Sequence, residues 1–423
     1  MQAAKALKSI MLVLTSQCNL RCAYCFENAK GPGRMEWKIL KAALDLALKH
    51  GRRRTRIVFY GGEPLLEFDL TRKAIAYAER ARAKHKRVSF TIVTNGTLLT
   101  ENRIAFLAKH SVNTQLSFDG VSPAQDLRGR GTFAYLDKLL ERTRRKYPDF
   151  YKRNVRINMT VVPQTVRYVA DSFEYFLRRN VRGIAIAPFI ADCSSWKADR
   201  IEQFEKEFVR IYKMSLAHFE QTGEIPLVLF HPDEGWPLRP ENSRTGSRRR
   251  TSVTEPLRRT SATVGAKAKS GSTAVSLRRR DRIPGGRLCS AGRGESLAVD
   301  VDGEVYPCVT LAGSYQTVTS SVLDKSIRAM SLGNLTGREF WKRYHGLPEI
   351  ASRLKVFASR EKQHSSYRMC RKCRYFAECF VCPAAVGRLP GNDSCERVPD
   401  FTCAFNFTVF KYRELFLKQI SPG

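Results

Sequence analysis

Short apolar runs alternate with longer amphipathic runs over the first half of the chain. The apolar runs are rich in β-branched and aromatic residues, which is typical of buried strands. The amphipathic runs place apolar residues three and four positions apart, which is the spacing of a helix with one buried face. The pattern predicts strands at Ile10–Leu14, Ile57–Tyr60, Phe90–Val93, Thr114–Phe118, Val155–Val162 and Ile184–Ile190. It predicts helices at Trp37–His50, Leu66–Lys84, Glu101–His110, Phe133–Lys146, Val169–Arg179 and Ala198–Phe219.

Six strand–helix units in succession predict a parallel sheet with helices outside it. Six units are too few to close an eight-stranded barrel, so we expect an α/β fold with a partial, TIM-like (β/α)6 barrel over residues 1–235. The active sites of such barrels lie at the carboxyl ends of the strands. Functional side chains are therefore expected directly after each predicted strand.

A basic stretch interrupts this pattern. Residues 239–287 hold 14 Lys and Arg against 3 Asp and Glu and contain no Phe, Trp or Tyr. Such a stretch cannot bury enough apolar surface to fold alone, so residues 236–287 are predicted to be a disordered linker or insertion. A nucleic-acid-binding arm, an insertion without function and a mistranslated stretch remain open. This stretch alone supplies +11 of the net charge of +33, so the charge is weak evidence for a nucleic-acid partner, which is not expected; the rest of the chain is still basic, and an acidic partner stays open.

The last part of the chain is rich in cysteines and turns. Residues 297–309 predict a hairpin turning at Asp302-Gly303, and Phe405–Gln419 has apolar residues at helical spacing. We therefore expect a small α+β domain over residues 288–423.

With no export signal and no apolar run of about 20 residues, the protein is predicted to be cytoplasmic and not membrane-bound. In that compartment the 12 cysteines indicate metal or redox chemistry rather than disulfides. Cys193, which stands apart, is expected to be a small buried apolar residue.

Three cysteines follow the first predicted strand with the spacing Cys-x3-Cys-x2-Cys: Cys18, Cys22 and Cys25. Three thiolates on one loop can bind three irons of a [4Fe–4S] cluster and leave the fourth iron open to a small molecule. A zinc knuckle is the alternative, but zinc needs a fourth ligand and no further His or Cys follows within the loop.

This loop resembles the signature of the radical S-adenosylmethionine (SAM) superfamily, in which an aromatic residue such as Tyr24 typically precedes the third cysteine. The resemblance implies that Cys18, Cys22 and Cys25 are catalytic. They would hold a cluster whose open iron chelates SAM and whose electron cleaves it, and the resulting radical would abstract hydrogen from a substrate.

Residues after the next three strands resemble further motifs of the superfamily. The resemblance implies that Gly61, Gly62, Glu63 and Pro64 hold the amino group of SAM, with Glu63 accepting from the ammonium. It also implies cofactor-binding roles for Asn95, Ser117, Asp119 and Arg128, with Arg128 favoured over Arg130 as the partner of the SAM carboxylate. For each polar residue taken singly, a role in a turn or a helix cap stays open.

The C-terminal cysteines resemble the SPASM extension, which binds auxiliary iron–sulfur clusters in one branch of the superfamily. Gly303 lies five residues before Cys308, and Gly333-Asn334 before an apolar helix also fits. The resemblance implies one cluster on Cys289, Cys308 and Cys382 and another on Cys370, Cys373, Cys379 and Cys403. Whether Cys395 or Cys403 closes the second set stays open, with Cys403 preferred because an aromatic-rich helix follows it. The alternative is a zinc ribbon on Cys370, Cys373, Cys379 and Cys382.

Enzymes with this extension usually modify peptides or proteins, so the resemblance implies peptide maturation by crosslinking or oxidation. An anaerobic sulfatase maturase is the second hypothesis, but there an Asp follows the cysteine of the Gly-x4-Cys element, and here Val309 follows Cys308. A nucleic-acid-modifying enzyme is the third. Expected partners are a peptide or protein substrate and an electron donor such as flavodoxin or ferredoxin. Since only about nine residues precede the first strand, a separate protein or the extension is expected to bind any leader peptide.

Overall fold

The structure is a computed structural model of the 423-residue chain. Four features predicted from the sequence lie outside the residues that it describes: the basic stretch 236–287, Cys193, Cys289 and Cys395. The described residues are 6–25, 31–189, 195–231, 291, 294–313, 330–345, 362–379, 381–382, 386, 389, 392, 394 and 396–421.

One twisted sheet organises the molecule, with strand order β6-β5-β4-β3-β2-β1-β7-β8. All neighbouring strands from β6 to β7 run parallel, and only the last pair is antiparallel. The strands are β1 (Leu7–Thr15), β2 (Gly51–Gly61), β3 (Arg87–Thr94), β4 (Asn113–Ser117), β5 (Val155–Val161), β6 (Ile184–Pro188), β7 (Ser296–Val299) and β8 (Val305–Tyr306).

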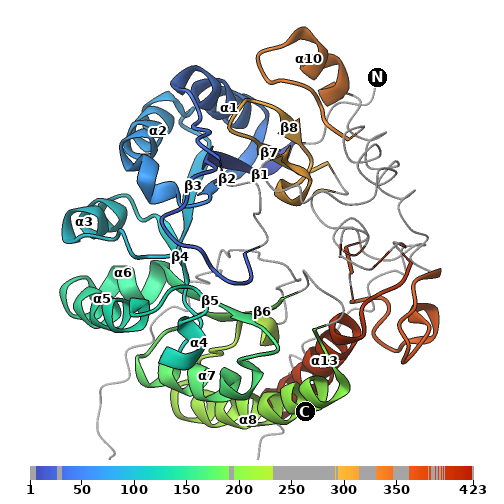
Figure 1. Ribbon diagram of the computed structural model, residues 1–423. Helices are drawn as coiled ribbons and strands as arrows, with labels where there is room; N and C mark the ends of the chain where they lie inside the picture. The colour runs from blue at the N-terminus through green and yellow to red at the C-terminus, as the bar shows by residue number, and fades with distance from the viewer. Residues whose placement is uncertain are drawn as a thin grey trace, which may run out of the picture.

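Helices form an outer layer around the curved sheet (Figure 1). The α-helices are α1 (Trp37–His50), α2 (Phe68–Ala81), α3 (Glu101–Lys109), α4 (Ser122–Gln125), α5 (Thr132–Lys146), α6 (Pro148–Asn154), α7 (Val169–Arg178), α8 (Ala198–Thr222), α10 (Arg338–His345) and α13 (Asp400–Ile420). Short 3-10 helices are η1 (Pro64–Glu67), η2 (Val166–Tyr168), η3 (Val228–Phe230), η4 (Val309–Leu311) and η7 (Cys370–Lys372).

The partial (β/α)6 barrel is confirmed, and each predicted strand and helix of the barrel is found within about three residues of its expected bounds, except that β2 begins at Gly51, well before the predicted Ile57. Helix ends follow local chemistry: Thr100 caps α3 by accepting a hydrogen bond from the Arg103 N–H, and α8 ends at Gly223 with φ +68°. Two short helices, α4 and α6, were not predicted. Both carry a proline in their first turn, where its missing N–H costs no helical hydrogen bond.

The predicted hairpin is also confirmed, as β7 and β8, but it is not separate from the barrel. Strand β7 pairs in parallel with β1, from Ser9 beside Ser296 to Leu12 beside Val299. The first strand of the chain therefore lies between β2 and a strand from the cysteine-rich part. The domain boundary near residue 288 stays a prediction, and the sheet runs across it.

Helix α13 joins the cysteine-rich part to the barrel at a second place. Its rings pack on those of α8 and of the residues before α8: Phe401 stacks on Trp196 with centroids 3.3 Å apart, and Phe405 stacks on Phe204 at 5.1 Å. Figure 1 shows α13 and α8 side by side. This aromatic contact is buried and holds the start of α13, where Cys403 lies, against the barrel wall.

Among the described residues, no helix has the length and apolar character needed to span a bilayer.

Candidate functional site

The loop that carries Cys18, Cys22 and Cys25 leaves the carboxyl end of β1, as the sequence predicts. Its entry is closed by hydrogen bonds to Gly33: the Ser16 N–H donates at 3.0 Å and the Thr15 hydroxyl at 2.9 Å. All three cysteines are partly exposed. Three partly exposed cysteines therefore lie on one loop at the carboxyl edge of the sheet, and the start of that loop is held by hydrogen bonds.

Gly61 and Gly62 allow two backbone segments to approach closely: the turn after β2 and the start of the cysteine loop. The Gly62 N–H donates to the Thr15 carbonyl at 2.9 Å, and the Glu63 N–H donates to the Gln17 carbonyl at 2.8 Å. A Cβ on Gly62 would lie 2.3 Å from the Gln17 carbonyl oxygen, and one on Gly61 would lie 2.3 Å from the Thr15 oxygen. Glycine is therefore required here because the turn after β2 presses against the start of the cysteine loop.

Glu63 joins the ends of two neighbouring strands. Its fully buried carboxylate accepts from the Thr94 hydroxyl at 2.7 Å, from the Asn95 N–H at 2.8 Å and from the Leu65 N–H at 3.0 Å. Burial raises the pKa of Glu63 from its ordinary 4.5 to about 7, although these hydrogen bonds oppose the rise. Both carboxylate oxygens thus already hold the protein together, and their remaining lone pairs are what a bound cation could use.

Asn95 extends this connection to the cysteine loop. Its side-chain N–H groups donate to the side-chain oxygen Oδ1 of Asn19 at 2.9 Å and toward Cys18 Sγ at 3.9 Å. Its own oxygen accepts from the Thr97 N–H at 2.9 Å and from the Thr97 hydroxyl at 2.6 Å. A continuous series of polar contacts therefore runs from Glu63 to the first cysteine.

A second buried group anchors the other end of the loop. The Asp119 carboxylate accepts two hydrogen bonds from Arg128, at 2.9 and 3.0 Å, as well as one from the Tyr24 hydroxyl and one from the Thr160 N–H at 2.8 Å. The Arg128 guanidinium lies over the Tyr24 ring, 5.2 Å from its centroid. Tyr24, next to Cys25, is thereby fastened to the ends of β4 and β5.

Burial shapes the electrostatics of this group. It raises the pKa of Tyr24 well above its usual range, with the Asp119 charge adding to the rise and the Arg128 charge opposing it. Burial works against the charge of Arg128, but Asp119 outweighs it, so the pKa of Arg128 is raised and the side chain stays cationic. The neighbouring Arg130 is exposed. Ser117 ends β4 beside Asn158 and is half-buried.

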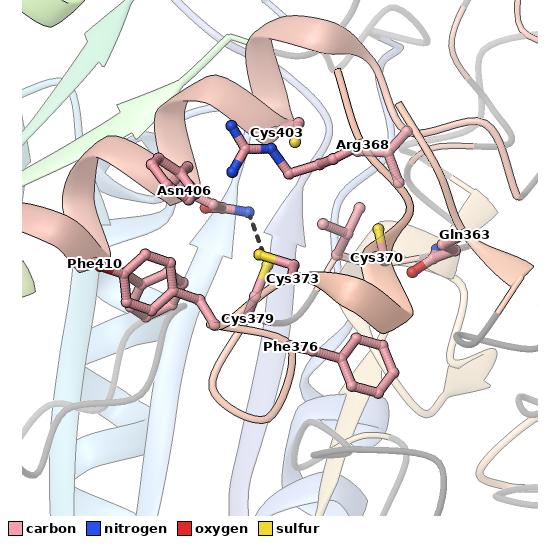
Figure 2. A pocket seen from close by; sticks show the side chains of 13 residues that line it. Gln363, Arg368, Cys370, Cys373, Phe376, Cys379, Cys403, Asn406 and Phe410 are labelled. Atoms are coloured by element: carbon pink, nitrogen blue, oxygen red, sulfur yellow. Dashed lines mark hydrogen bonds between the residues drawn. The ribbon is translucent and has the colours of Figure 1, made fainter. Parts of the chain in front are cut away.

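Four C-terminal cysteines line a single pocket: Cys370, Cys373, Cys379 and Cys403. Figure 2 shows them approaching from the turn η7, the following loop and the start of α13. This is the set that the sequence assigned to the second auxiliary cluster. Burial raises the pKa of the Cys403 thiol, while Ser365 and the Arg368 charge oppose that rise.

Cys382, the fourth ligand of the alternative zinc ribbon, does not line this pocket. It packs instead with Cys308 against one small apolar cluster built around Val13, Tyr306 and Leu311. The two described members of the other predicted set therefore pack against the same apolar cluster, and Cys308 Sγ also lies 3.2 Å from the Thr310 hydroxyl.

The donor chemistry of both cysteine groups fits iron–sulfur clusters, because thiolates are their usual protein ligands. In the described part of the chain, no three His, Cys, Asp or Glu side chains are already gathered as ligands of a single metal ion. The C-terminal pocket fits in a further respect, since Arg368, one of its lining residues, has a buried Nε with no hydrogen-bond partner. A bound anionic group would satisfy such an atom.

Sequence reasoning missed several residues that complete these sites: Asn19, Thr97, Gln125, Thr160, Arg368 and Asn406. Asn406 carried a usable signal, because it lies one helical turn after Cys403 and so shares its face of α13. Thr160 carried none, since its backbone N–H donates to Asp119 and its hydroxyl accepts from Arg128 only because distant strand ends meet.

Two family models match the chain. The radical SAM superfamily matches residues 12–176, and an iron–sulfur cluster-binding domain, SPASM, matches residues 289–374. The cysteine-type anaerobic sulfatase-maturating enzyme of Clostridium novyi is 26% identical over 197 residues, which are 44% of this chain and 51% of that enzyme. The radical SAM cyclopropyl synthase TigE of Paramaledivibacter caminithermalis is 23% identical over 201 residues, covering 41% and 38%. The chain thus spans about half the length of these curated relatives, or less.

Solved structures share the whole fold. Native anSMEcpe with bound AdoMet and Kp18Cys peptide superposes with a TM-score of 0.65 at 18% identity and covers 97% of this chain and 98% of its own. Streptococcus suis SuiB bound to precursor peptide SuiA gives a TM-score of 0.54 at 14% identity, covering 95% and 76%. At these identities the likeness establishes the architecture. The two matched models therefore give this chain a radical SAM domain at residues 12–176 and a SPASM iron–sulfur cluster-binding domain at residues 289–374.

Proposed function

We propose that this protein is an enzyme that reductively cleaves SAM and abstracts hydrogen from a peptide or protein, with Cys18, Cys22 and Cys25 holding the catalytic [4Fe–4S] cluster. One observation carries the proposal. The three-cysteine loop stands at the carboxyl edge of a parallel sheet and is fastened there through Glu63–Asn95 and through Tyr24–Asp119. That edge is where barrels of this kind place their chemistry.

The cluster, when bound, would supply the electron that cleaves SAM. The residues of the chain would position both groups. Most hydrogen-bonding groups of Glu63, Asn95 and Asp119 already bond to neighbouring strand ends and loops, so their main role is to hold the site rigid. Arg128 uses Nε and Nη2 on Asp119 and Thr160, which leaves Nη1 directed at no described acceptor. We assign Arg128 Nη1 and the Ser117 hydroxyl to direct contact with the cofactor.

A peptide or protein substrate is supported by the relatives. The Clostridium novyi relative is named as a maturating enzyme, and the two structural neighbours hold a peptide or a precursor peptide. Two auxiliary clusters would serve as electron acceptors for such an oxidation: one on Cys370, Cys373, Cys379 and Cys403, and one on Cys289, Cys308 and Cys382. The proposal also includes a flavodoxin- or ferredoxin-like electron donor, a separate leader-binding protein, and a cytoplasmic location.

A cysteine-type sulfatase maturase is the second candidate, because such enzymes are among the curated relatives. Against it, Val309 follows Cys308 at the position where the resemblance calls for an Asp. Val309 opens the short helix η4 and offers no group that could move a proton. We therefore favour a peptide-modifying reaction other than sulfatase maturation.

The test uses anaerobically reconstituted full-length protein with SAM, a strong reductant and a candidate precursor peptide. Wild type should bind about twelve irons, from three four-iron clusters, and the product should have lost two hydrogens by mass spectrometry. The triple variant C18A/C22A/C25A should lose about a third of the iron and all SAM cleavage.

The double variant C370A/C373A is the matched comparison. It should also lose about a third of the iron but retain SAM cleavage, while failing to form product. A protein that takes up only zinc would refute the cluster assignment. Full product formation by C370A/C373A would show that the auxiliary cluster is not the electron acceptor, and turnover of a nucleic acid or small molecule without any peptide product would refute the peptide substrate.

A further inference from the structure

Two polar side chains reach the sulfur atoms of the C-terminal pocket. The first is Asn406 on α13, whose Nδ2 donates toward Cys379 Sγ at 3.6 Å, within the range of a hydrogen bond to sulfur (Figure 2). Asn406 lies three residues after Cys403, so one turn of α13 supplies both a thiol and an N–H donor to the pocket.

The second is Arg368, two residues before Cys370. Its neighbours Tyr367 and Met369 are 51% and 38% exposed, whereas Arg368 itself turns inward and lines the pocket. Its guanidinium carbon lies 3.8 Å from the centre of the Phe407 ring, and Figure 2 shows the side chain extending toward α13 between Cys403 and Asn406.

The charge of Arg368 is not balanced within the described part of the chain. No described carboxylate forms an ion pair with it, and its buried Nε has no hydrogen-bond partner. Burying part of a cation without a counter-ion costs free energy, and a bound anion would offset that cost. The group that this pocket fits is a cluster held by four thiolates, which is anionic.

The reduction potential of an iron–sulfur cluster depends on the net charge near it, on hydrogen bonds to its sulfurs and on its solvent exposure. When such a cluster accepts one electron from a reductant, it gains one negative charge. A fixed positive charge and an N–H donor stabilise that added charge, and so they raise the potential.

We propose that Arg368 and Asn406 raise the reduction potential of the auxiliary cluster at Cys370, Cys373, Cys379 and Cys403, and so make it a better electron acceptor. The inference rests on the proposed cluster at these cysteines. Neither residue is assigned as an iron ligand. Both act on the cluster through space, as tuning residues.

The experiment is an anaerobic redox titration of the reconstituted full-length chain, followed by electron paramagnetic resonance. It is done in the C18A/C22A/C25A background, and the relevant signal is the one that adding C370A/C373A removes. At one fixed potential, R368Q should lower the ratio of reduced to oxidised cluster about tenfold, which is 59 mV for a one-electron couple. Asn406→Leu should lower it about threefold, and R368K should restore most of the wild-type ratio.

Arg374→Gln is the matched control, because Arg374 is adjacent to Cys373 but points to solvent, with 63% of its side chain exposed and an ion pair to Glu414. The ratio of reduced to oxidised cluster in Arg374→Gln should equal that of wild type. An unchanged ratio in R368Q and N406L with full iron content would overturn the inference, as would equal shifts in R368Q and R374Q. If R368Q loses iron, the test rests on the other two variants. A reduced-to-oxidised ratio about threefold lower in N406L, and close to wild type in R368K, would then support the inference. If C370A/C373A removes neither iron nor signal, the cluster itself is refuted.

Discussion

The cysteine loop after β1 and the cysteine pocket beside α13 differ in what holds them in place. The loop is tied through buried hydrogen bonds to the ends of β2, β3, β4 and β5, and its main anchors are Glu63 and Asp119. The pocket is built from a 3-10 turn, a loop and one helix end, and a buried polar atom of its lining, Arg368 Nε, has no hydrogen-bond partner among the described residues. The comparison teaches that hydrogen bonds within the protein preorganise the first site, whereas the second leaves a buried donor unsatisfied, as expected of a site that the proposed cluster completes.

The strongest way to break this comparison is to remove Asp119. Asp119→Ala should lower the free energy of unfolding by about 3–5 kcal/mol, because it leaves the buried Arg128 without its carboxylate. Urea unfolding of the iron-free protein measures the loss. The double variant Asp119→Ala/Arg128→Met should recover part of it, since it removes both charges.

Asp137 provides the control for this variant. It accepts from Tyr175 and Arg179 on the helical layer, and its side chain is 30% exposed. Asp137→Ala should therefore cost no more than about 1 kcal/mol. Equal losses for Asp119→Ala and Asp137→Ala would mean that the cysteine loop is not specially anchored.

The next effect concerns pH. Burial raises the pKa of Glu63 from 4.5 to about 7, so between these values the folded state keeps a proton that the unfolded state has released. Its contribution to stability is full below pH 4.5 and is lost as the pH rises through 7, by about 3 kcal/mol at most. Glu63→Gln should remove this downward slope in the iron-free protein. Unfolding free energies at intermediate pH values measure the difference, and parallel curves for the two proteins would contradict it.

The smallest effect comes from Gly62→Ala. The added Cβ would meet the Gln17 carbonyl at 2.3 Å and the Cys18 Cβ at 3.1 Å, so the cysteine loop must move. We expect a loss of about 1–3 kcal/mol, as for other overpacked sites. Iron should fall by up to about a third, from the first cluster alone.

Gly223→Ala is the counterpart for Gly62→Ala. Gly223 has φ +68° and open space around it, so alanine there adds backbone strain without touching either site. It should keep its full iron content. Loss of iron from Gly223→Ala, or full iron and wild-type stability in Gly62→Ala, would show that the close approach after β2 does not position the cysteines.

Much of the barrel could be predicted because its signals are local. The helix α1 has the predicted bounds Trp37–His50. The six parallel strands coincide with short apolar runs, which the spacing of apolar residues along the chain reveals. The pairing of β7 with β1 could not be predicted, since no local pattern specifies which distant strand completes a parallel edge.

The site was predicted as a set of residue types but not as a network. Glu63 and Asn95 were expected as separate contacts to a cofactor, and the structure also bonds them to each other. Likewise Tyr24, Asp119 and Arg128 form one buried group. Sequence motifs identify such residues because the motif recurs, but which side chains satisfy each other depends on the meeting of strand ends far apart in the chain.

The place of β1 in the sheet also bears on how the protein is made. Its partner β2 follows it closely along the chain, but its other neighbour, β7, begins only at Ser296. At the usual pace of translation, roughly 15 to 60 seconds separate the two strands at the ribosome. During that interval the outer edge of β1 presents unpaired N–H and C=O groups, which readily recruit foreign strands. The strand that leads into the three cysteines is therefore an open edge of the nascent barrel, and the cysteine-rich part of the chain finally covers it.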